Sequence, residues 1–352
     1  MARATITQVA RRAGVSIASA SRALNGQGAS AATLERVRAA AAELGYVADA
    51  SARSLKLGRT MQLAYAVADI GNPVYVEMMA AIESVVADAG YRLVVSKTGD
   101  AAGTVDLVRE LGRGYVDGMI LSPLRVTDEL VAALEGAPVP TVVLGRLPES
   151  AEVDTVRADS AAGMALVVEH LVAAGRRRIA FLNGPADTTP GRLRREGFAA
   201  AVAAHPGLET SEVEASDFTI AAGAAAAGEL LSDGAPRPDA IVAANDLIGI
   251  GALHAAGDAG LRVPDELAVS GVDDTELARV TRPGLTSVAL GSAERGRAAA
   301  ELLLARLADP ARECTSVTVA PRLVVRGSTA QGADGRGAGT GGPAREQEVA
   351  AR

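Results

Sequence analysis

The chain has 352 residues, of which 49% are hydrophobic and 22% charged, and its formal net charge is −7. No apolar run reaches the roughly 20 residues of a bilayer-spanning helix, and arginines near the start interrupt any signal-peptide core, so we expect a cytoplasmic protein that does not contact a membrane. One cysteine and three scattered histidines exclude an intramolecular disulfide and a metal cluster, and we expect neither metal nor cofactor.

The charge is distributed unevenly. Residues 1–60 carry nine basic and three acidic side chains, a net charge of +6, so the remaining residues carry −13. A solvated charged surface could have this composition. The asymmetry also suits a protein that contacts phosphate with one end while its acidic body keeps the complex oriented.

Two short helices joined by a tight turn are predicted near the start. Apolar residues recur at helical spacing over residues 6–13, and Thr5 is placed to accept hydrogen bonds from the first free amides. Gly14 tolerates the left-handed conformation at the corner, and Ser16 can cap the next helix. A helical hairpin without function can have this pattern, but a DNA-binding helix-turn-helix has it too.

The second helix is predicted over residues 17–24. Its inward side chains are Ala20, Ala23 and Leu24, and Asn25-Gly26 ends it. The opposite side of a recognition helix contacts base edges. The outward side chains here are Ile17, Ala18, Ser21 and Arg22.

A third helix over residues 31–44 is predicted to complete a small core. Ser30 caps it and Gly45 ends it. The residues that recur at helical spacing and are expected to close the core are Leu34, Val37, Ala41 and Leu44.

From Met61 short apolar strands alternate with longer helices, a pattern that predicts parallel α/β structure. We expect one lobe from strands 62–68, 91–96, 117–122 and 141–144, and a second from helix 161–174 and strands 178–182, 240–244 and 267–271. A strand over 286–290, a helix over 293–307 and closing strands over 316–319 and 322–325 follow. This order takes the chain between the lobes more than once, which predicts a hinged pair with a cleft.

Polar side chains follow the ends of the predicted strands. A ligand of an open α/β sheet lies beyond the carboxyl ends of the strands. Carboxylates, amides and an aromatic ring suit a polyhydroxylated ligand, because each hydroxyl both donates and accepts hydrogen bonds. The residues placed there are Asp69, Tyr75, Ser122, Arg146, Asn245 and Asp273.

Several short motifs resemble those of the LacI/GalR family of bacterial transcriptional regulators, and the resemblance covers residues 3 to about 329. In the first segment they are Ala13-Gly14-Val15-Ser16, Leu24-Asn25, Leu44-Gly45-Tyr46 and Ala52-Arg53-Ser54-Leu55. Later motifs are Ala243-Ala-Asn-Asp246 and Gly271-Val-Asp-Asp274.

The resemblance implies a four-part α/β chain. An all-α helix-turn-helix headpiece would occupy residues 1–47, and a hinge helix that enters the minor groove would occupy residues 48–60. A two-lobed core with parallel sheets, similar to periplasmic sugar-binding proteins, would span residues 61–329. Residues 330–352 are rich in glycine and predict a disordered tail.

The resemblance also implies residue roles in DNA binding. Ile17, Ala18 and Arg22 would contact bases, and Leu55 would be wedged between base pairs. The residues expected to hold phosphates are Ser16, Ser21, Asn25, Ser30 and Thr33, and Thr5 and Tyr46 complete the expected set.

In the core, the resemblance implies that Arg194 clamps the effector, Phe218 stacks on it, and Asn245 and Asp273 bind its polar groups. The alternatives without a role in ligand binding are that Phe218 belongs to the hydrophobic core and that Arg194 lies on a solvated helix face. Asp159 and Asp274 could equally be helix caps or contacts of the lobe hinge. Gly145 and Leu290 stand where some family members have Asp and Gln, so the effector's identity is not transferred.

The predicted function is a sequence-specific regulator, most often a repressor, that binds a palindromic DNA operator as a homodimer under the control of a small effector, a sugar or related metabolite. Two alternatives remain. A solute-binding component fits the core but not the basic first segment. An enzyme using Asp273 and Asp274 as acid and base has no nucleophile paired with a base, and adjacent carboxylates rarely face one another.

Overall fold

The computed structural model describes residues 4–24, 28–47, 58–232, 236–330 and 347–350. The chain divides into two compact units, Met1–Thr60 and Met61–Arg352, which are described separately. This division falls where we expected the core to begin. Residues 48–57 of the predicted hinge helix, including Leu55, lie outside the described residues, and so does Asn25.

The described residues of the first unit form three helices, α1 (Ile6–Ala13), α2 (Ile17–Leu24) and α3 (Ala31–Glu43). Thr5 caps α1 in a capping box with Gln8, and Gly14 adopts φ of 65° at the helix end. The predicted inner face of α2 is confirmed at Ala20 and Ala23. The core consists almost entirely of alanine and valine: Val9, Ala10, Ala13, Ala20, Ala23, Val37, Ala40 and Ala41.

One prediction for this core is wrong. Leu44 was expected to close it, but α3 ends at Glu43 and Leu44 is the C-terminal cap, with 36% of its surface exposed. Ala40 is buried in its place. The helix ends one residue earlier than the apolar spacing suggests, because the left-handed Gly45 (φ 60°) already turns the chain away.

The second unit begins with a lobe built on a six-stranded sheet in the order β11-β5-β4-β3-β1-β2. Every pair in it is parallel. The strands are β1 (Gln62–Val67), β2 (Arg92–Lys97), β3 (Gly118–Ser122), β4 (Thr141–Leu144), β5 (Asp154–Ala158) and β11 (Ser316–Val319).

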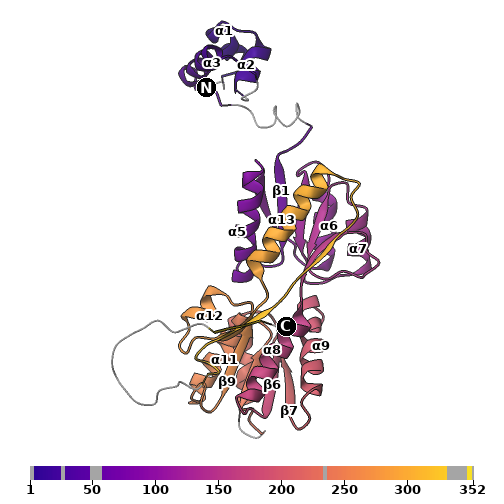
Figure 1. The fold of residues 1–352 in the computed structure, drawn as a ribbon, viewed down its shortest axis with the longest axis vertical. Helices are drawn as coiled ribbons and strands as arrows, with labels where there is room; N and C mark the ends of the chain where they lie inside the picture. The colour runs from indigo at the N-terminus through magenta and orange to yellow at the C-terminus, as the bar shows by residue number, and fades with distance from the viewer. Residues whose placement is uncertain (1–3, 25–27, 48–57, 233–235, 331–346, 351–352) are drawn as a thin grey trace, which may run out of the picture. The chain divides into compact units, whose positions relative to one another are not determined.

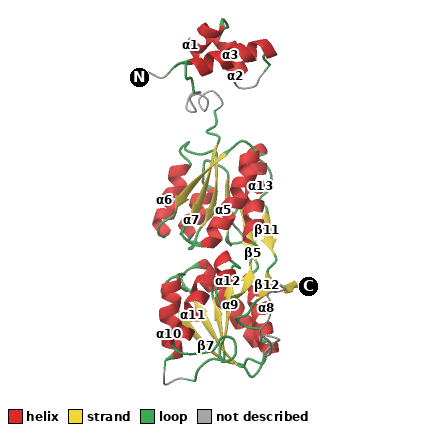
Figure 2. Ribbon diagram, turned by 90° about the vertical axis from the view of Figure 1, so that its left-hand side faces the viewer, coloured by secondary structure: helices red, strands yellow, loops and turns green. Residues whose placement is uncertain are grey.

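Helices cover both faces of this sheet, as Figure 2 shows. They are α5 (Pro73–Asp88), α6 (Ala101–Leu111), α7 (Asp128–Glu135) and α13 (Ser292–Ala308). Helix α13 comes from the C-terminal part of the chain, yet it lies beside α5 (Figure 1) and packs against α5 and against strands β3, β4 and β5 of this sheet. The two faces of the sheet carry separate apolar clusters.

The second lobe is built on a seven-stranded sheet in the order β13-β12-β10-β9-β8-β6-β7. Its strands are β6 (Arg178–Asn183), β7 (Glu209–Glu214), β8 (Ala240–Ala243), β9 (Ala268–Val272), β10 (Thr286–Ala289), β12 (Arg322–Val325) and β13 (Gln347–Ala350). Its helices are α8 (Ser160–Ala173), α9 (Thr189–Ala203), α10 (Ile220–Leu231), α11 (Asp246–Asp258) and α12 (Glu276–Val280). Strand β12 runs antiparallel to both neighbours.

The chain passes between the lobes three times, at residues 158–160, 289–292 and 319–322. Asp159 lies at the first passage and caps α8, because its carboxylate accepts from the Ala162 amide at 2.9 Å. Gly291 lies at the second passage with φ of 68°, and a β-carbon there would stand 2.5 Å from Val319 Cγ1. Only glycine fits this conformation and this close approach.

The sequence did not predict three of the strands, β5, β7 and β13. Strand β5 begins with Asp154, which is buried and pairs with Arg306 at 3.0 Å. Strand β7 is a sheet edge of mostly exposed polar residues. In addition, residues 347–350 pair with β12, which differs from the disordered tail that we expected there; residues 331–346 lie outside the described part of the chain.

Candidate functional site

A cavity of about 160 Å³ lies between the two lobes of the second unit. The lobes meet here because parallel strands of both end at this cleft. All eight predicted effector residues line it. Those from the first lobe are Asp69, Tyr75, Ser122 and Arg146, and those from the second are Arg194, Phe218, Asn245 and Asp273.

Arg194 and Asp273 form the charged floor of the cavity. Arg194 projects from α9 and is buried, whereas its neighbours Arg192, which is exposed, and Arg195, which is half-buried, pair with surface glutamates. Its guanidinium donates to the Ala244 carbonyl at 2.6 Å and to Asp273 Oδ1 at 3.2 Å. The alternative that Arg194 lies on a solvated helix face is therefore wrong.

Asp273 ends β9 in an unusual conformation. Its φ is 108° and that of Asp274 is 54°, both in the left-handed region that costs energy for residues other than glycine. Burial raises the pKa of Asp273 above its ordinary value, and the charges of Arg194 and Arg295 oppose that rise. The strained backbone and the buried carboxylate both cost free energy, so contacts from the surrounding structure must stabilise Asp273 in this conformation.

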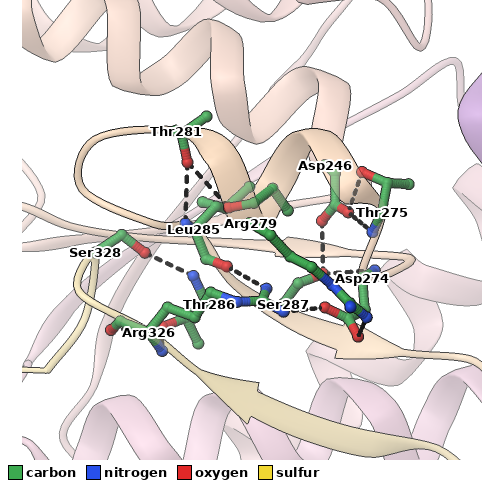
Figure 3. A network of polar contacts seen from close by, with 11 residues as sticks. Asp246, Asp274, Thr275, Arg279, Thr281, Leu285, Thr286, Ser287, Arg326 and Ser328 are labelled. Atoms are coloured by element: carbon green, nitrogen blue, oxygen red, sulfur yellow. Dashed lines mark hydrogen bonds and ion pairs between the residues drawn. The ribbon is translucent and has the colours of Figure 1, made fainter. Parts of the chain in front are cut away.

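A polar network behind Asp273 provides this support (Figure 3). The Asp274 carboxylate accepts from Arg279 at 3.2 Å and from Arg326, and its amide donates to Ser287 Oγ at 2.9 Å. The two adjacent carboxylates thus point to different partners, Asp273 toward Arg194 in the cavity and Asp274 toward the network. Asp274 is a structural contact rather than a cap of α12.

Asp246 is a buried member of the same network (Figure 3). It accepts from the Thr275 amide at 2.7 Å, from Thr275 Oγ1 at 2.9 Å and from Ser287 Oγ. Burial, and then the nearby charge of Asp273, raise the pKa of Asp246 to about 7. This carboxyl titrates near neutral pH and ties α11 to the strand end that carries Asp273.

Asn245 and Phe218 line the second-lobe wall. Asn245 caps α11, because its Oδ1 accepts from the Ile248 amide at 2.9 Å, and its Nδ2 donates to the Phe218 carbonyl at 3.4 Å. The Phe218 ring lies directly against Gly184, where a β-carbon would stand 2.2 Å from Phe218 Cε1. Phe218 is half-buried and borders the cavity, so it is placed to stack on a ligand.

The first-lobe wall is more open. Asp69 and Arg146 are exposed at the rim, and Ser122 Oγ lies 3.4 Å from the buried Tyr65 hydroxyl. Burial, followed by the charge of Asp273, raises the pKa of Tyr75 to about 12. Tyr75 therefore remains a neutral hydrogen-bonding group on this wall at physiological pH.

Arg295, which was not predicted as a site residue, lies in the first turn of α13 and lines the cavity. It is 9% exposed, and its Nε has no hydrogen-bond partner among the described residues. The signal was available: a helix that begins where the chain crosses between lobes must place its first turn at the cleft. Arg157 and Asn72 also line the cavity and were not predicted.

In the first unit, the predicted base-contacting residues are exposed on α2. Ile17 has 50% of its surface exposed, and Ala18 and Arg22 are exposed as well. An exposed isoleucine on a helix that also carries an arginine is a surface suited to base edges and thymine methyl groups. Ser21 is half-buried on the same helix.

The predicted phosphate-contacting residues lie mainly at helix starts. Ser16 accepts from the Ser19 amide at 3.1 Å, and Ser30 accepts from the Thr33 amide at 3.3 Å. Helix N-termini attract phosphate because their free amides and dipole favour anions. Tyr46 packs half-buried against the alanine core.

The described residues show neither a membrane-spanning helix nor a metal-binding cluster. No described helix is long and apolar enough to span a membrane. Among the described side chains, no group of three or more histidine, cysteine, aspartate or glutamate residues could hold a metal ion.

Comparison with known families gives two matches. Residues 5–49 match the bacterial regulatory proteins of the lacI family, and residues 168–329 match the periplasmic binding protein-like domain. The chain is 34% identical to the ribose operon repressor of Escherichia coli (strain K12), over 92% of this chain and 99% of the relative. It is 35% identical to the HTH-type transcriptional regulator CelR of Thermobifida fusca, over 93% and 98%.

Solved structures agree. A crystal structure of the lac repressor dimer bound to operator and the anti-inducer ONPF superimposes with a TM-score of 0.84 at 28% identity, covering 94% of this chain and all of that chain. A complex of the transcriptional regulator CelR with cellobiose gives a TM-score of 0.69 at 34% identity, covering 93% of this chain and all of that chain.

Proposed function

The chain belongs to the LacI family of bacterial regulatory proteins, and from this premise we propose that it represses transcription as a homodimer on a palindromic operator, under the control of a small polyhydroxylated effector. DNA as its partner places the protein in the cytoplasm. The observation that carries the effector proposal is the cavity between the lobes, into which both lobes contribute polar side chains.

A sugar or a related metabolite fits this cavity. Arg194, Asp273 and Asn245 supply charged and amide groups at its second-lobe side, and Phe218 supplies a ring on which a sugar face can stack. One similar protein is the ribose operon repressor, and the structure of another, CelR, has been solved in complex with cellobiose. We assign effector binding to these four residues and to Asp69, Tyr75, Ser122 and Arg146.

We assign DNA binding to the exposed side of α2 and the helix starts around it. Arg22 would donate to a guanine, while Ile17 and Ala18 would contact thymine methyl groups. Ser16, Ser21, Ser30, Thr33, Thr5 and Tyr46 would fix the phosphate backbone. Asn25 and Leu55, outside the described residues, keep the phosphate and minor-groove roles that the family resemblance implies.

Two headpieces held at a fixed separation bind more tightly than one, because the second contact becomes intramolecular. A two-fold dimer then requires a near-palindromic site. The effector would control DNA binding by binding one arrangement of the two lobes more tightly than another. By linkage, effector and DNA change each other's binding free energy by the same amount.

We propose no catalytic activity. The one pair of adjacent carboxylates at the site diverges, since Asp273 binds Arg194 and Asp274 binds Arg279 and Arg326. General acid and base catalysis needs two groups that face one substrate bond. Turnover of any sugar by the purified protein would contradict this part of the proposal.

The test is selection of bound duplexes from a random DNA pool by the full-length protein at physiological salt. We expect a palindrome of about 16 to 20 base pairs, consistent with two half-sites of a dimer. Arg22→Ala should relax the preference at one base pair of each half-site, and Leu55→Ala should abolish tight binding. Arg92→Ala, an exposed arginine of the core, is the control and should behave as wild type. Sequence-indifferent binding by the wild type would overturn the proposal.

A further inference from the structure

Arg295 is a buried cation that lines the cavity and forms no ion pair with a residue that the structure describes. It lies in the first turn of α13, only 9% exposed, and lines the cavity from the first-lobe side. Its Nε has no hydrogen-bond partner, and no ion pair joins its guanidinium to a residue that the structure describes. Burying a charge without a partner is costly, because the side chain loses its hydration and gains nothing in return.

The charges around Arg295 do not balance within the protein. The carboxylate that most influences it is Asp273, but Asp273 already forms an ion pair with Arg194 at 3.2 Å. The remaining groups near its guanidinium are the hydroxyls of Tyr65 and Tyr75, which are neutral at physiological pH. The cavity floor therefore has two guanidinium groups for one carboxylate.

The acidic residues at the rim do not correct this imbalance. Asp69 and Asp217 line the cavity but are exposed to solvent. The exposed Arg146 and the half-buried Arg157 also line the cavity, and their two positive charges offset these two carboxylates. One positive charge remains at the buried end of the cavity, where a ligand is removed from water.

We propose that the effector carries a carboxylate that Arg295 binds, which makes it a sugar acid, of the aldonic or uronic class, rather than a neutral sugar. The proposal rests on the proposed function, since it names the effector of the same cavity. A guanidinium presents two parallel donors that match the two oxygens of a carboxylate. The hydroxyls of such an acid would meet Asp273, Asn245 and Arg194, which the second lobe contributes to the cavity.

A carboxylate accounts for the charge better than a phosphate ester does. The excess at the floor is a single positive charge, which a monoanion neutralises, whereas a phosphate ester carries between one and a half and two negative charges at neutral pH, by analogy with phosphorylated side chains. Both ligands share the oxygen anion that Arg295 would recognise, so the test includes both.

The experiment measures binding to the purified full-length protein by calorimetry and by thermal shift, without DNA. The probes are acids paired with their neutral parents: D-gluconate with D-glucose, D-galacturonate with D-galactose, and D-ribonate with D-ribose. D-glucose 6-phosphate is the phosphate probe. The variants are Arg295→Met and Arg295→Lys, and the control is Arg297→Met, because Arg297 is exposed on the same helix.

We expect at least one acid to bind more tightly than its neutral parent. Arg295→Met should weaken that acid roughly 10- to 100-fold, as expected for loss of charge-assisted hydrogen bonds, and leave its neutral parent unchanged. Arg295→Lys should retain part of the preference, and Arg297→Met all of it. Without ligand, Arg295→Met should melt at a higher temperature than wild type, because an unpaired buried charge is gone.

Three results would overturn the inference. One is that no acid binds better than its neutral parent, and another is that glucose 6-phosphate binds while the carboxylates do not. The third is that Arg295→Met weakens acids and neutral sugars equally and lowers the ligand-free melting temperature, as loss of a purely structural residue would. Failure of the proposed function is separate, since it appears as loss of sequence-specific DNA binding by the wild type.

Discussion

The headpiece and the core place their functional side chains in opposite ways. On α2, Ile17, Ala18 and Arg22 are exposed and need only the helix beneath them. In the cavity, Arg194 and Asp273 are buried, 79 residues apart in sequence, and each is held by the other. Substitutions in the headpiece should therefore act one residue at a time, whereas substitutions in the cavity should disturb partners.

The largest effect should come from Arg194→Met. The variant leaves the buried Asp273 carboxylate without its ion pair, which costs about 3–5 kcal/mol in comparable cases. Urea unfolding of the core measures the loss. Arg192→Met on the same helix removes only an exposed pair with Glu196 and should cost less than about 0.5 kcal/mol. Equal stability of the two variants would show that the buried pair of Arg194 and Asp273 contributes no more to stability than the exposed pair of Arg192 and Glu196.

Gly184→Ala should come next. The new β-carbon would stand 2.2 Å from the Phe218 ring, so the ring must move away from the cavity wall. We expect a loss of about 1–3 kcal/mol, together with weaker effector binding, both measured by thermal shift with and without ligand. Gly228→Ala is the control, because no atom lies within 4 Å of its β-carbon site in α10, and it should be neutral or stabilising. If Gly184→Ala bound effector normally, Phe218 would not be part of the site.

The Asp246 carboxyl should make core stability depend on pH. The pKa of Asp246 is about 7 in the folded protein and 3.8 when the carboxyl is free of the fold. Between pH 3.8 and pH 7 the folded state therefore binds one more proton than the unfolded state. The protonated carboxyl stabilises the folded core fully below about pH 4, and this stabilisation is lost as the pH rises through 7. The free energy of unfolding should fall by about 1 kcal/mol between pH 6 and pH 8. Urea titrations at several pH values measure it.

His170 opposes this trend, since burial lowers its pKa, so the informative quantity is the difference between variant and wild type. Asp246→Asn should remove the fall, and Asp258→Asn, at the exposed end of the same helix, should keep it. A wild-type slope that Asp246→Asn leaves intact would assign the proton elsewhere.

The smallest effect should come from the headpiece. Thr5→Ala removes a capping box at α1 and should cost about 0.5–1 kcal/mol, confined to the headpiece transition in calorimetry. Thr7→Ala, exposed within the same helix, should be neutral or slightly stabilising. A shift of the core transition by Thr5→Ala would contradict the independence of the two units.

The same contrast explains what the sequence could predict. The caps Thr5, Ser16 and Ser30 depend on residues two or three positions away, so local spacing was sufficient. Strand ends located the cavity residues, because parallel strands deliver their carboxyl ends to one edge. Leu44 was misplaced because a helix end depends on a single turn, and β7 was missed because an exposed edge strand has no apolar alternation.

Arg295 required knowledge that spacing does not contain. Its helix, α13, follows the second lobe in sequence and packs in the first. The start of α13 at a passage between the lobes, rather than the spacing of its residues, indicates that its first turn faces the cavity. The family resemblance did not identify Arg295 either, since Arg295 lies in none of the motifs on which the resemblance rests.

The three passages between lobes also set the order of events during synthesis. Thr155 of β5 pairs with Ser316 of β11, 161 residues later, and α13 covers the face of the first sheet on which α5 packs. A ribosome adding 5–20 residues per second needs roughly 10 to 30 seconds for that interval. During it the nascent first lobe has an open sheet edge and an uncovered apolar face while the second lobe emerges. The order of the strands thus leaves the N-terminal lobe incomplete until β11, its last strand, has been synthesised.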